Sequence, residues 1–430
     1  MARSSRHPPI RSELMGLLTY ARMCPLDDTP RLIVADWLEE NGDQADRDRA
    51  TFIRLQCEQS RYDAVGRRRR ELSAAENQLL EKHQKSWLGG LMALQSSKAR
   101  FTRGLVDLFV EAPNLFKQGM NAVLHSEAVG WIDELHLSKT SLYYLEKFLK
   151  MPLAGLIGGL VIGNESLPAA ACQSIAHCEL LQRLHTLDLN YNPIGNEGAV
   201  ALSQSPDLGN LQHLDLWICG IEAEGARALA SMRCEPQPYW INLGGNGIGE
   251  EGIRALASSS LLEKVRRFLI WGNSIRDTGL THLVRGPYLQ QIEELYLNEN
   301  NLGMKAARVL ATWPPLQNLR TLSIWGNLLR PRGGAILGSA PMPQMRMLLL
   351  SSTRIGDEGL RALANNPTLG KLHSLDVSNT RSTDEGIRCL LDSPFLKQLK
   401  NLNISGNTVS AALQAECESR FEMTVRDEVP

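Results

Sequence analysis

The sequence predicts an α/β solenoid, with a curved parallel sheet inside and helices outside, preceded by a small N-terminal helical domain. Two observations predict this fold: an apolar strip that recurs at a nearly constant spacing, and a helix-like stretch after each strip. The strip Leu184-His-Thr-Leu187-Asp-Leu189-Asn-Tyr-Asn192 returns in related form up to Leu399–Asn407. A fixed period of this length is typical of arrays in which each unit buries its apolar face only against its neighbours.

Twelve units can be placed in register along residues 101–410. They begin at Leu105, Ile132, Ile157, Leu184, Leu211, Pro238, Val265, Ile292, Leu319, Met345, Leu372 and Leu399. All steps have the same length except that from Ile132 to Ile157, which is shorter by two, and that from Leu319 to Met345, which is shorter by one. We count positions within a repeat from these first residues.

The first half of each repeat reads as a strand. Positions 4 and 6 are apolar and are expected to face the interior, whereas positions 3, 5 and 7 lie on the other face and are expected to contact solvent. Position 9 is asparagine in six repeats: Asn192, Asn246, Asn273, Asn300, Asn327 and Asn407. Its amide can bond the main chain where the strand bends away, so stacked repeats should form an asparagine ladder. Cys219, Thr353 and Thr380 take this place in three repeats.

The second half reads as a helix. Position 19 is leucine in eight successive repeats: Leu202, Leu229, Leu256, Leu283, Leu310, Leu337, Leu363 and Leu390. It should pack on the sheet. Acidic residues such as Glu197, Asp357, Glu358 and Asp384 lie in or near the first turn, where the helix dipole favours them. Glycine recurs at residues 198, 225, 252, 279, 359 and 386, although it lowers helix propensity; we expect close packing there to exclude a side chain.

The L-x-x-L-x-L-x-x-N core and the 27-residue unit resemble leucine-rich repeats of the ribonuclease-inhibitor type over about residues 105–410. Strands need about 4.8 Å each and helices roughly 8–10 Å, so such a stack bends into a horseshoe. The resemblance implies a protein-binding scaffold, since that family consists largely of such scaffolds, with some regulators of small GTPases. It implies no particular partner.

Residues 10–100 carry no repeat and read as a helical domain behind a flexible N-terminus, residues 1–9. We expect Thr29 to cap a helix, with Pro30 at the first helical position, and Asn41-Gly42 to end that helix. The string from Asp28 to Asp43, followed by Phe52-Ile-Arg-Leu-Gln56, resembles the bacterial repeat-companion domain, which stands at the head of repeat proteins. The resemblance implies a bacterial origin and adds almost nothing about activity.

Both ends of the array are expected to be capped. The helical domain can close the first end through a small core of Trp37, Leu38, Ile33, Phe52 and Leu55. Residues 411–430 read as a C-terminal cap, with a closing helix at 411–421 and a short strand at 421–425. Because terminal repeats would otherwise expose their apolar faces, both segments have a structural reason to be there.

Composition excludes several classes of function. A formal net charge of -1 gives no long-range attraction to nucleic acid or anionic lipid, and no stretch is long and apolar enough to span a bilayer. The basic run Arg67–Arg70 points in several directions on a helix and is followed by acidic residues, so we interpret it as a solvated face. Eight cysteines without a C-x-x-C pair indicate reduced thiols, no metal and a cytoplasmic protein.

Aromatic residues on the inner face are the main binding candidates. Trp217, Trp271 and Trp325 hold position 7 of every second repeat, with Trp240 at position 3 and Tyr296 at position 5 of intervening repeats. Exposed tryptophan and tyrosine are common anchors of protein interfaces. Alternatively, each ring shelters a neighbouring glycine backbone, and both interpretations can hold together.

A polar group on the same face offers further candidates. Asp188 and Asp215 hold position 5 of adjacent repeats, with His213 at position 3. Such a pair could form a solvated patch, hold a basic partner, bind a cation, or have a raised pKa suited to acid–base chemistry. Arg267 and Glu294 share position 3 on adjacent strands and should pair.

No catalytic or cofactor motif is present, and no cofactor is expected. The sequence therefore predicts a non-enzymatic scaffold that presents its concave surface to a protein or peptide. One alternative is a regulator of a partner enzyme such as a small GTPase, for which Arg330 and Arg332 are the candidate catalytic arginines. Another is a purely architectural assembly element. The sequence does not indicate an oligomeric state.

Overall fold

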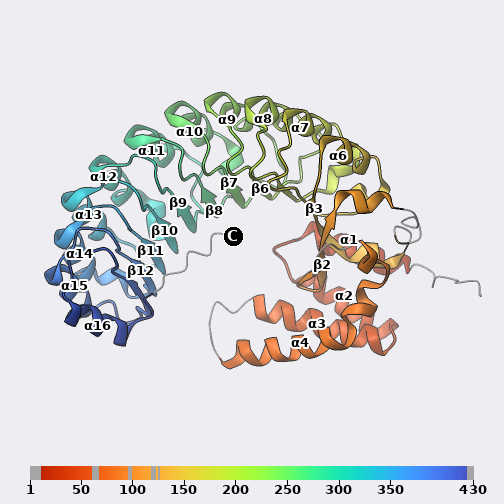
Figure 1. The fold of residues 1–430 in the computed structure, drawn as a ribbon, viewed down its shortest axis with the longest axis horizontal. Coiled ribbons are helices and arrows are strands. Elements are labelled where there is room, and N and C mark those ends of the chain that lie inside the picture. Colours follow the sequence, from red (N-terminus) through yellow and green to blue (C-terminus); the bar gives the residue numbers. More distant parts are fainter. Residues whose placement is uncertain (1–10, 61–66, 95–98, 118–122, 124–125, 424–430) are drawn as a thin grey trace, which may run out of the picture. The chain divides into compact units, whose positions relative to one another are not determined.

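A computed structural model of the chain describes residues 11–60, 67–94, 99–117, 123 and 126–423 (Figure 1). The expectation of a flexible segment at residues 1–9 lies outside the described residues. The chain forms two compact units, residues 1–189 with 206–211 and residues 190–205 with 212–430. Each unit is described by itself.

The first unit begins with four helices. They are α1 (Ser12–Met23), α2 (Thr29–Asn41), α3 (Gln44–Ser60) and α4 (Arg67–Leu88), followed by the 3-10 helix η1 (Gly89–Ala93). Helix α2 includes Thr29, so the capping position falls on Asp28 rather than on Thr29 as expected. Of the expected small core, Leu38 and Phe52 are fully buried, whereas Ile33 is exposed.

Helices α3 and α4 contact Phe101 of β1 (Arg100–Thr102), which pairs antiparallel with β2 (Leu105–Glu111). The ring of Phe52 lies 5.1 Å from that of Trp87 and 5.5 Å from that of Phe101. Gln56 donates to the carbonyl of Phe101 at 2.8 Å and accepts from the amide of Gly104 at 2.7 Å. The α3 helix is therefore bonded directly to the start of the repeat region.

The rest of the first unit consists of short repeats. Its strands are β3 (Ile132–Ser138), β4 (Gly159–Val161) and β5 (Thr186–Asp188). Its helices are α6 (Leu142–Phe148), α7 (Ala169–Ala176), and the 3-10 helices η2 (Ala112–Phe116), η3 (Glu127–Trp131), η4 (Pro152–Gly155) and η5 (Glu179–Arg183). From β2 to β5 the strands pair parallel in chain order.

The second unit is the regular part of the solenoid. Its strands are β6 (His213–Asp215), β7 (Trp240–Asn242), β8 (Arg267–Leu269), β9 (Glu294–Tyr296), β10 (Thr321–Ser323), β11 (Met347–Leu349), β12 (Ser374–Asp376) and β13 (Asn401–Asn403). Its helices are α8 (Gly195–Ser203), α9 (Ala223–Leu229), α10 (Gly249–Ala257), α11 (Arg276–Arg285), α12 (Met304–Ala311), α13 (Arg330–Gly338), α14 (Gly356–Ala364), α15 (Asp384–Leu391) and α16 (Ala411–Arg420), with the 3-10 helices η6 (Ser260–Leu262), η7 (Pro314–Gln317) and η8 (Pro367–Leu369). The strands pair parallel from β6 to β13, on the inner side of a curved stack with the helices outside (Figure 1).

The predicted core positions are buried. All eight leucines at position 19 are at most 3% exposed, and Leu189, Leu216 and Leu297 at position 6 are fully buried. This confirms the register and the α/β solenoid with its N-terminal helical region. Full burial of one such side chain stabilises the fold by about 1.5–3 kcal/mol, so one buried leucine per repeat contributes at each step of the stack.

The asparagine ladder is present as predicted. The Asn300 side-chain oxygen accepts from the Asn273 amide at 2.9 Å, and its nitrogen donates to the Ile270 carbonyl at 2.9 Å and to the Leu297 carbonyl at 3.2 Å. Asn246, Asn273, Asn327 and Asn407 make equivalent bonds. Where threonine replaces asparagine, at 353 and 380, its hydroxyl donates to a carbonyl three residues earlier. Each of these asparagines thus ties its repeat to the preceding one.

A second link joins several repeats to the following one. At position 13, Asp277 accepts from the amide of Gly303 at 2.7 Å, Asp357 from that of Thr383 at 2.7 Å, and Asp384 from that of Ser410 at 2.7 Å. The bonds with Ser410 lower the pKa of Asp384. These carboxylates therefore cap the next helix rather than only complementing the dipole of their own.

The recurring helix glycine makes room for this link. A Cβ at Gly386 would lie 2.3 Å from the Asp357 carboxylate, and one at Gly225 would lie 2.7 Å from the Asn196 side-chain oxygen, which caps in the same way. The expectation that close packing excludes a side chain at this position is confirmed. At Gly225 and Gly386 the nearest atom belongs to the preceding repeat, whereas at Gly252 and Gly359 it belongs to an isoleucine of the same repeat, Ile248 or Ile355.

The C-terminal end closes with α16. The Ser410 hydroxyl accepts from the Leu413 amide at the start of this helix, and Leu413 and Cys417 are buried. Glu422 then forms a single bridge with Asn401 of β13, where a short strand was expected. Residues 424–430 of the predicted cap lie outside the described residues.

Candidate functional site

The inner wall of the second unit is more deeply packed than the sequence suggested. Trp240 at position 3 is 5% exposed and Tyr296 at position 5 is 3% exposed, with the fully buried Leu269 between them. The expectation that these two aromatic residues face solvent is wrong. Strands only about 4.8 Å apart place two neighbours against every side chain, so a large ring lies flat across the adjacent strand and is covered.

Arg267 lies over this aromatic cluster. Its guanidinium carbon is 6.0 Å from the Trp240 ring centroid and 5.6 Å from that of Tyr296. It also forms the expected ion pair with Glu294, at 3.2 Å. The half-buried Arg267–Glu294 ion pair therefore covers the buried rings of Trp240 and Tyr296, and together they form a band across β7, β8 and β9.

The polar candidates have structural partners. His213 stacks on Trp240 with ring centroids 3.8 Å apart. Asp215 is 7% exposed, and its carboxylate accepts from the amide of Trp217 at 3.0 Å and from the side chain of Asn242 at 3.2 Å. The solvated-patch interpretation is therefore wrong for Asp215.

Asp188, its expected neighbour, is half-buried on β5 of the first unit. Across the described ranges of the chain, no group of three or more histidine, cysteine, aspartate or glutamate side chains could hold a metal ion.

Three exposed or half-exposed rings form a continuous row, which we call the aromatic row: Tyr191, Trp217 and Trp271. Ring centroids are 4.6 Å apart between Tyr191 and Trp217, and 5.6 Å apart between Trp217 and Trp271. Both pairs meet edge to face, with interplanar angles of 71° and 66°, as aromatic quadrupoles favour. The row lies beside the carboxyl ends of the strands, at positions 7 and 8 of its repeats.

Gly244 allows the row to exist. It holds position 7 in the repeat between Trp217 and Trp271, and a Cβ there would lie 2.2 Å from Trp271 Nε1. The missing side chain lets Trp271 lie across the glycine and reach Trp217. Trp271 therefore shelters a glycine backbone, as one of the two interpretations proposed, while part of its ring stays exposed.

Trp325 stands apart from the row. The intervening position 7 is Asn298, whose side chain is buried and accepts from the Ser323 hydroxyl at 2.5 Å. Within the described part of the chain, Trp325 makes no ring contact with another aromatic residue. It is half-exposed, so it forms a separate aromatic position on the same edge.

Tyr191 was missed by the sequence analysis, although its ring is 42% exposed. It holds position 8, where the main chain takes a left-handed conformation, with φ of 54° at Tyr191. This conformation turns the side chain toward position 7 of the next repeat. The signal available in the sequence was a tyrosine directly before the ladder asparagine, one repeat ahead of Trp217.

The candidate catalytic arginines of the alternative function are exposed. Arg330 and Arg332 border a surface hollow of about 910 Å³ at the start of α13, together with Glu358 and Met304. Nothing in this hollow pairs a nucleophile with a base.

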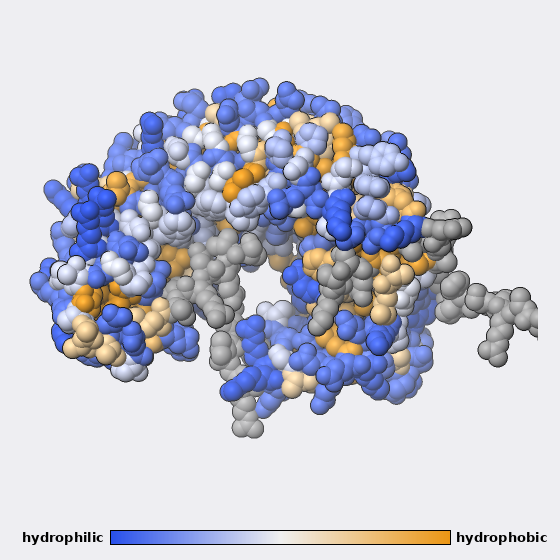
Figure 2. Space-filling model, in the orientation of Figure 1, coloured by the Kyte–Doolittle hydropathy of each residue, from blue (hydrophilic) through white to orange (hydrophobic). Residues whose placement is uncertain are grey.

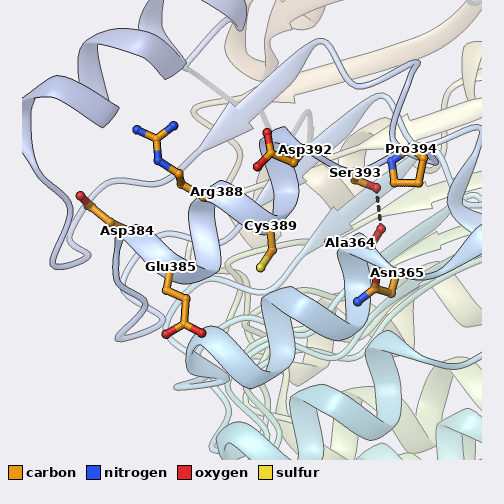
Figure 3. A pocket seen from close by; sticks show the side chains of 9 residues that line it. All are labelled: Ala364, Asn365, Asp384, Glu385, Arg388, Cys389, Asp392, Ser393 and Pro394. Carbon is orange, nitrogen blue, oxygen red and sulfur yellow. Dashed lines mark hydrogen bonds between the residues drawn. The ribbon is translucent and has the colours of Figure 1, made fainter.

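A second hollow, of about 520 Å³, lies on the outer side at α14 and α15, with Cys389 directed into it (Figure 3). Its polar groups already have partners: Ser393 donates to the carbonyl of Ala364 at 2.5 Å, and Arg388 pairs with Glu416 at 3.2 Å. The outer, helical side of the second unit is mainly hydrophilic (Figure 2). Neither hollow therefore presents a reactive group of side chains.

A leucine-rich-repeat family model matches residues 182–203, 210–230, 241–257 and 345–364. The chain carries leucine-rich repeats. No curated protein matches the sequence. In none of the described helices is there an apolar stretch long enough to span a membrane.

Two solved structures resemble this chain. The yeast Rad7 and Elc1 complex contains a chain that is 16% identical, with a TM-score of 0.54, and the match covers 92% of this chain and 94% of that one. An internalin from Listeria monocytogenes is 17% identical, with a TM-score of 0.36, covering 65% of this chain and 87% of that one. The likeness to the first is one of fold.

Proposed function

We propose that this leucine-rich-repeat protein is a non-enzymatic scaffold that binds a protein or peptide on the inner face of its second unit. The observation that supports this most is the aromatic row, because three partly exposed rings in contact form a rigid apolar platform. Tyrosine and tryptophan anchors of this kind often supply about 2 kcal/mol or more of binding free energy. The Rad7 structure, solved as a complex with Elc1, also favours a protein partner.

Among the residues predicted for binding, Trp217, Trp271 and Trp325 would contact the partner directly, together with Tyr191. Four other predicted residues would support this surface without contacting the partner. Trp240 and Tyr296 are buried, His213 stacks on Trp240, and Asp215 accepts a hydrogen bond from the amide of Trp217. Asp188, on the first unit, remains a proposed contact. The concave surface of the second unit would thus present aromatic side chains that rest on a layer of buried and hydrogen-bonded residues.

We also propose that residues 10–100 cap the repeats and that the protein works in the cytoplasm. The bonds of Gln56 and the Phe52–Trp87–Phe101 cluster support the capping role. Among the described residues all eight cysteines are free thiols, as expected in a reducing compartment. Burial raises the pKa of Cys57 and of Cys234 to about 12, so these thiols stay protonated and unreactive.

Affinity capture from an extract of the source organism tests the scaffold proposal. The immobilised chain is compared with a variant carrying Tyr191→Ser at an exposed position and Trp325→Ser at a half-exposed one. Tyr143→Ser is the matched control, because Tyr143 is 59% exposed on α6. We expect the double variant to bind the captured protein at least tenfold more weakly, with the control unchanged. Equal binding by all three proteins contradicts the proposed surface.

A further inference from the structure

A line of arginines follows the aromatic row along the same edge of the second unit. Arg354 and Arg381 lie at position 10 of their repeats, in the turn between strand and helix, and Arg276 and Arg330, at position 12, are the first residues of α11 and α13. We call them the arginine ridge. All four side chains are exposed, and main-chain bonds such as that from Arg330 N to Thr353 O, at 3.1 Å, hold the neighbouring turns together.

The ridge arginines have no intramolecular partner for their charge. In the part of the chain that the structure describes, none of the four makes a side-chain hydrogen bond, ion pair or cation–π contact. Three arginines on the helices of the same unit pair with carboxylates, as Arg254–Glu251, Arg361–Glu385 and Arg388–Glu416. Among the described residues, Arg227, Arg285 and Arg308 on other helices form no ion pair and are exposed like the ridge arginines. The ridge guanidinium groups therefore remain available to a ligand.

The main chain at these positions favours glycine. The four arginines have φ values of 57°, 63°, 57° and 64°, in the left-handed region that side chains with a Cβ disfavour. Other repeats place Gly195, Gly249 and Gly356 at position 12, and Gly220, Ser274 and Asn301 at position 10, all with φ between 54° and 71°. Arginine at four such turns costs conformational free energy that glycine would not.

Nearby carboxylates lower the net charge of this edge but do not pair with the ridge arginines. Asp277, Asp357 and Asp384 lie close to them in the sequence, and each accepts a hydrogen bond from a main-chain amide of the following repeat. Glu358 shares the hollow with Arg330 and is exposed. It is the acidic group placed to compete directly with a ligand for the ridge.

We propose that the arginine ridge binds an acidic polypeptide segment in an extended conformation. Repeats are spaced between about 5 Å at the strands and about 10 Å at the helices, and alternate side chains of an extended peptide recur every ~6.8 Å. Each guanidinium can take a carboxylate in a two-point contact. The inference rests on the proposed function, since the segment would belong to the protein held on the aromatic row.

The experiment uses a fluorescein-labelled peptide of twelve glutamates, titrated against the full chain at low ionic strength and followed by anisotropy. The ridge variant carries Arg276→Asn, Arg330→Asn, Arg354→Asn and Arg381→Asn. Asparagine suits a left-handed turn, as Asn301 does at φ of 57° in its own repeat. The control removes the same charge from exposed arginines away from the ridge, with Arg227→Gln, Arg233→Gln, Arg285→Gln and Arg308→Gln.

We expect the ridge variant to bind the peptide roughly 30-fold more weakly, because each exposed charge pair is worth about a two- to threefold change in affinity. The control should change less than threefold, and Glu358→Gln should tighten binding about twofold. Melting curves of the two quadruple variants check that both are folded. Should the ridge variant fold poorly, Arg354→Asn and Arg381→Asn made singly should each weaken binding about twofold.

Three results overturn the proposal: no binding by the wild type, equal losses in the ridge and control variants, or tighter ridge-dependent binding of a twelve-residue oligothymidylate. The peptide assay needs no natural partner. It is therefore read separately from the capture experiment, and Tyr191→Ser with Trp325→Ser should leave glutamate-peptide binding unchanged. Loss of capture with intact peptide binding would count against the scaffold surface alone.

Discussion

Gly244→Ala tests the aromatic row most directly. The added Cβ would lie 2.2 Å from Nε1 and 2.4 Å from Cε2 of Trp271, so the indole must move away from its seat over the glycine. Gly244 itself has no left-handed backbone, so the new methyl group adds no main-chain strain. The whole cost therefore comes from displacing Trp271.

The magnitude follows from what the indole loses. An edge-to-face aromatic pair is worth about 0.5–1.5 kcal/mol beyond the area it buries. Re-exposing on the order of 40 Å² of ring surface adds about 1 kcal/mol at ~25 cal/mol per Å². We expect the free energy of unfolding to fall by about 2 kcal/mol, and the near-UV circular dichroism from the coupled Trp217 and Trp271 rings, 5.6 Å apart, to weaken.

Denaturant unfolding of four proteins measures the effect: wild type, Gly244→Ala, Trp271→Ala and the double variant. In the Trp271→Ala background the Gly244→Ala cost should nearly vanish, because nothing remains to displace. Gly370→Ala is the control, since a Cβ there meets nothing within 4 Å and its φ of -60° suits alanine. An undiminished cost in the double variant, or no cost in the single one, refutes the account of Gly244 as the opening for Trp271.

Three further outcomes are expected. Asn300→Ala should lower the free energy of unfolding by about 3 kcal/mol, because it leaves buried main-chain groups such as the Asn273 amide without a hydrogen-bond partner. Chemical denaturation measures this loss, and a change below about 1 kcal/mol would contradict the stabilising role of the asparagine ladder. Asp357→Ala should cost about 1 kcal/mol by uncapping the next helix at Thr383, with faster amide hydrogen exchange there than in wild type; unchanged exchange would argue against the cap. Burial, with the Glu134 carboxylate, raises the pKa of Asp107 to about 6. The folded carboxyl holds its proton more tightly than the unfolded one, whose pKa is about 3.9. The contribution of Asp107 to the free energy of unfolding is therefore fully present below pH ~4 and is lost as the pH rises through about 6. Asp107→Asn should flatten the dependence of the melting temperature on pH across that window, and an unaltered profile would exclude the assignment.

Periodicity in the sequence was enough to place the repeats. An apolar side chain at position 4 or 6 has only one direction in which to be buried, so Leu189 and Leu297 could be assigned to the core from spacing alone. The asparagine ladder could be predicted for the same reason, since an amide that recurs at the same bend of each repeat must meet its copies in adjacent units. Asn300 and its equivalents show this in the regular repeats.

The burial of individual side chains on the inner face could not be predicted in this way. Strand alternation predicts which face of the sheet a side chain lies on, but it does not predict how much of that side chain its neighbours cover. Trp240 and Tyr296 are buried because Leu269 lies between them and Arg267 lies over them, on a strand one repeat away from each. Trp271 stays half-exposed because Gly244 leaves it room to lie over the edge. These outcomes depend on which residues share a level of the sheet, which appears only when repeats are stacked.

The arginine ridge could not be predicted from the amino-acid composition either. The chain is nearly neutral, with 46 basic and 47 acidic residues, and single arginines in separate repeats do not form a charged run. They become a line because equivalent turns stack, and they stay unpaired because the carboxylates beside them point at the next helix. Only Arg330 among them was singled out from the sequence, and for another reason.

The two links between repeats bear on how such a chain can change its length over evolution. Where both residues occur, the ladder asparagine bonds the repeat before it and the capping aspartate bonds the repeat after it; Ala223, Met304 and Pro331 hold the capping position in other repeats. Duplicating or deleting a whole repeat therefore keeps the residues at these positions in register with their neighbours. A deletion of part of a repeat would break both links at once, so the solenoid can change its length without losing these bonds only by gaining or losing whole repeats.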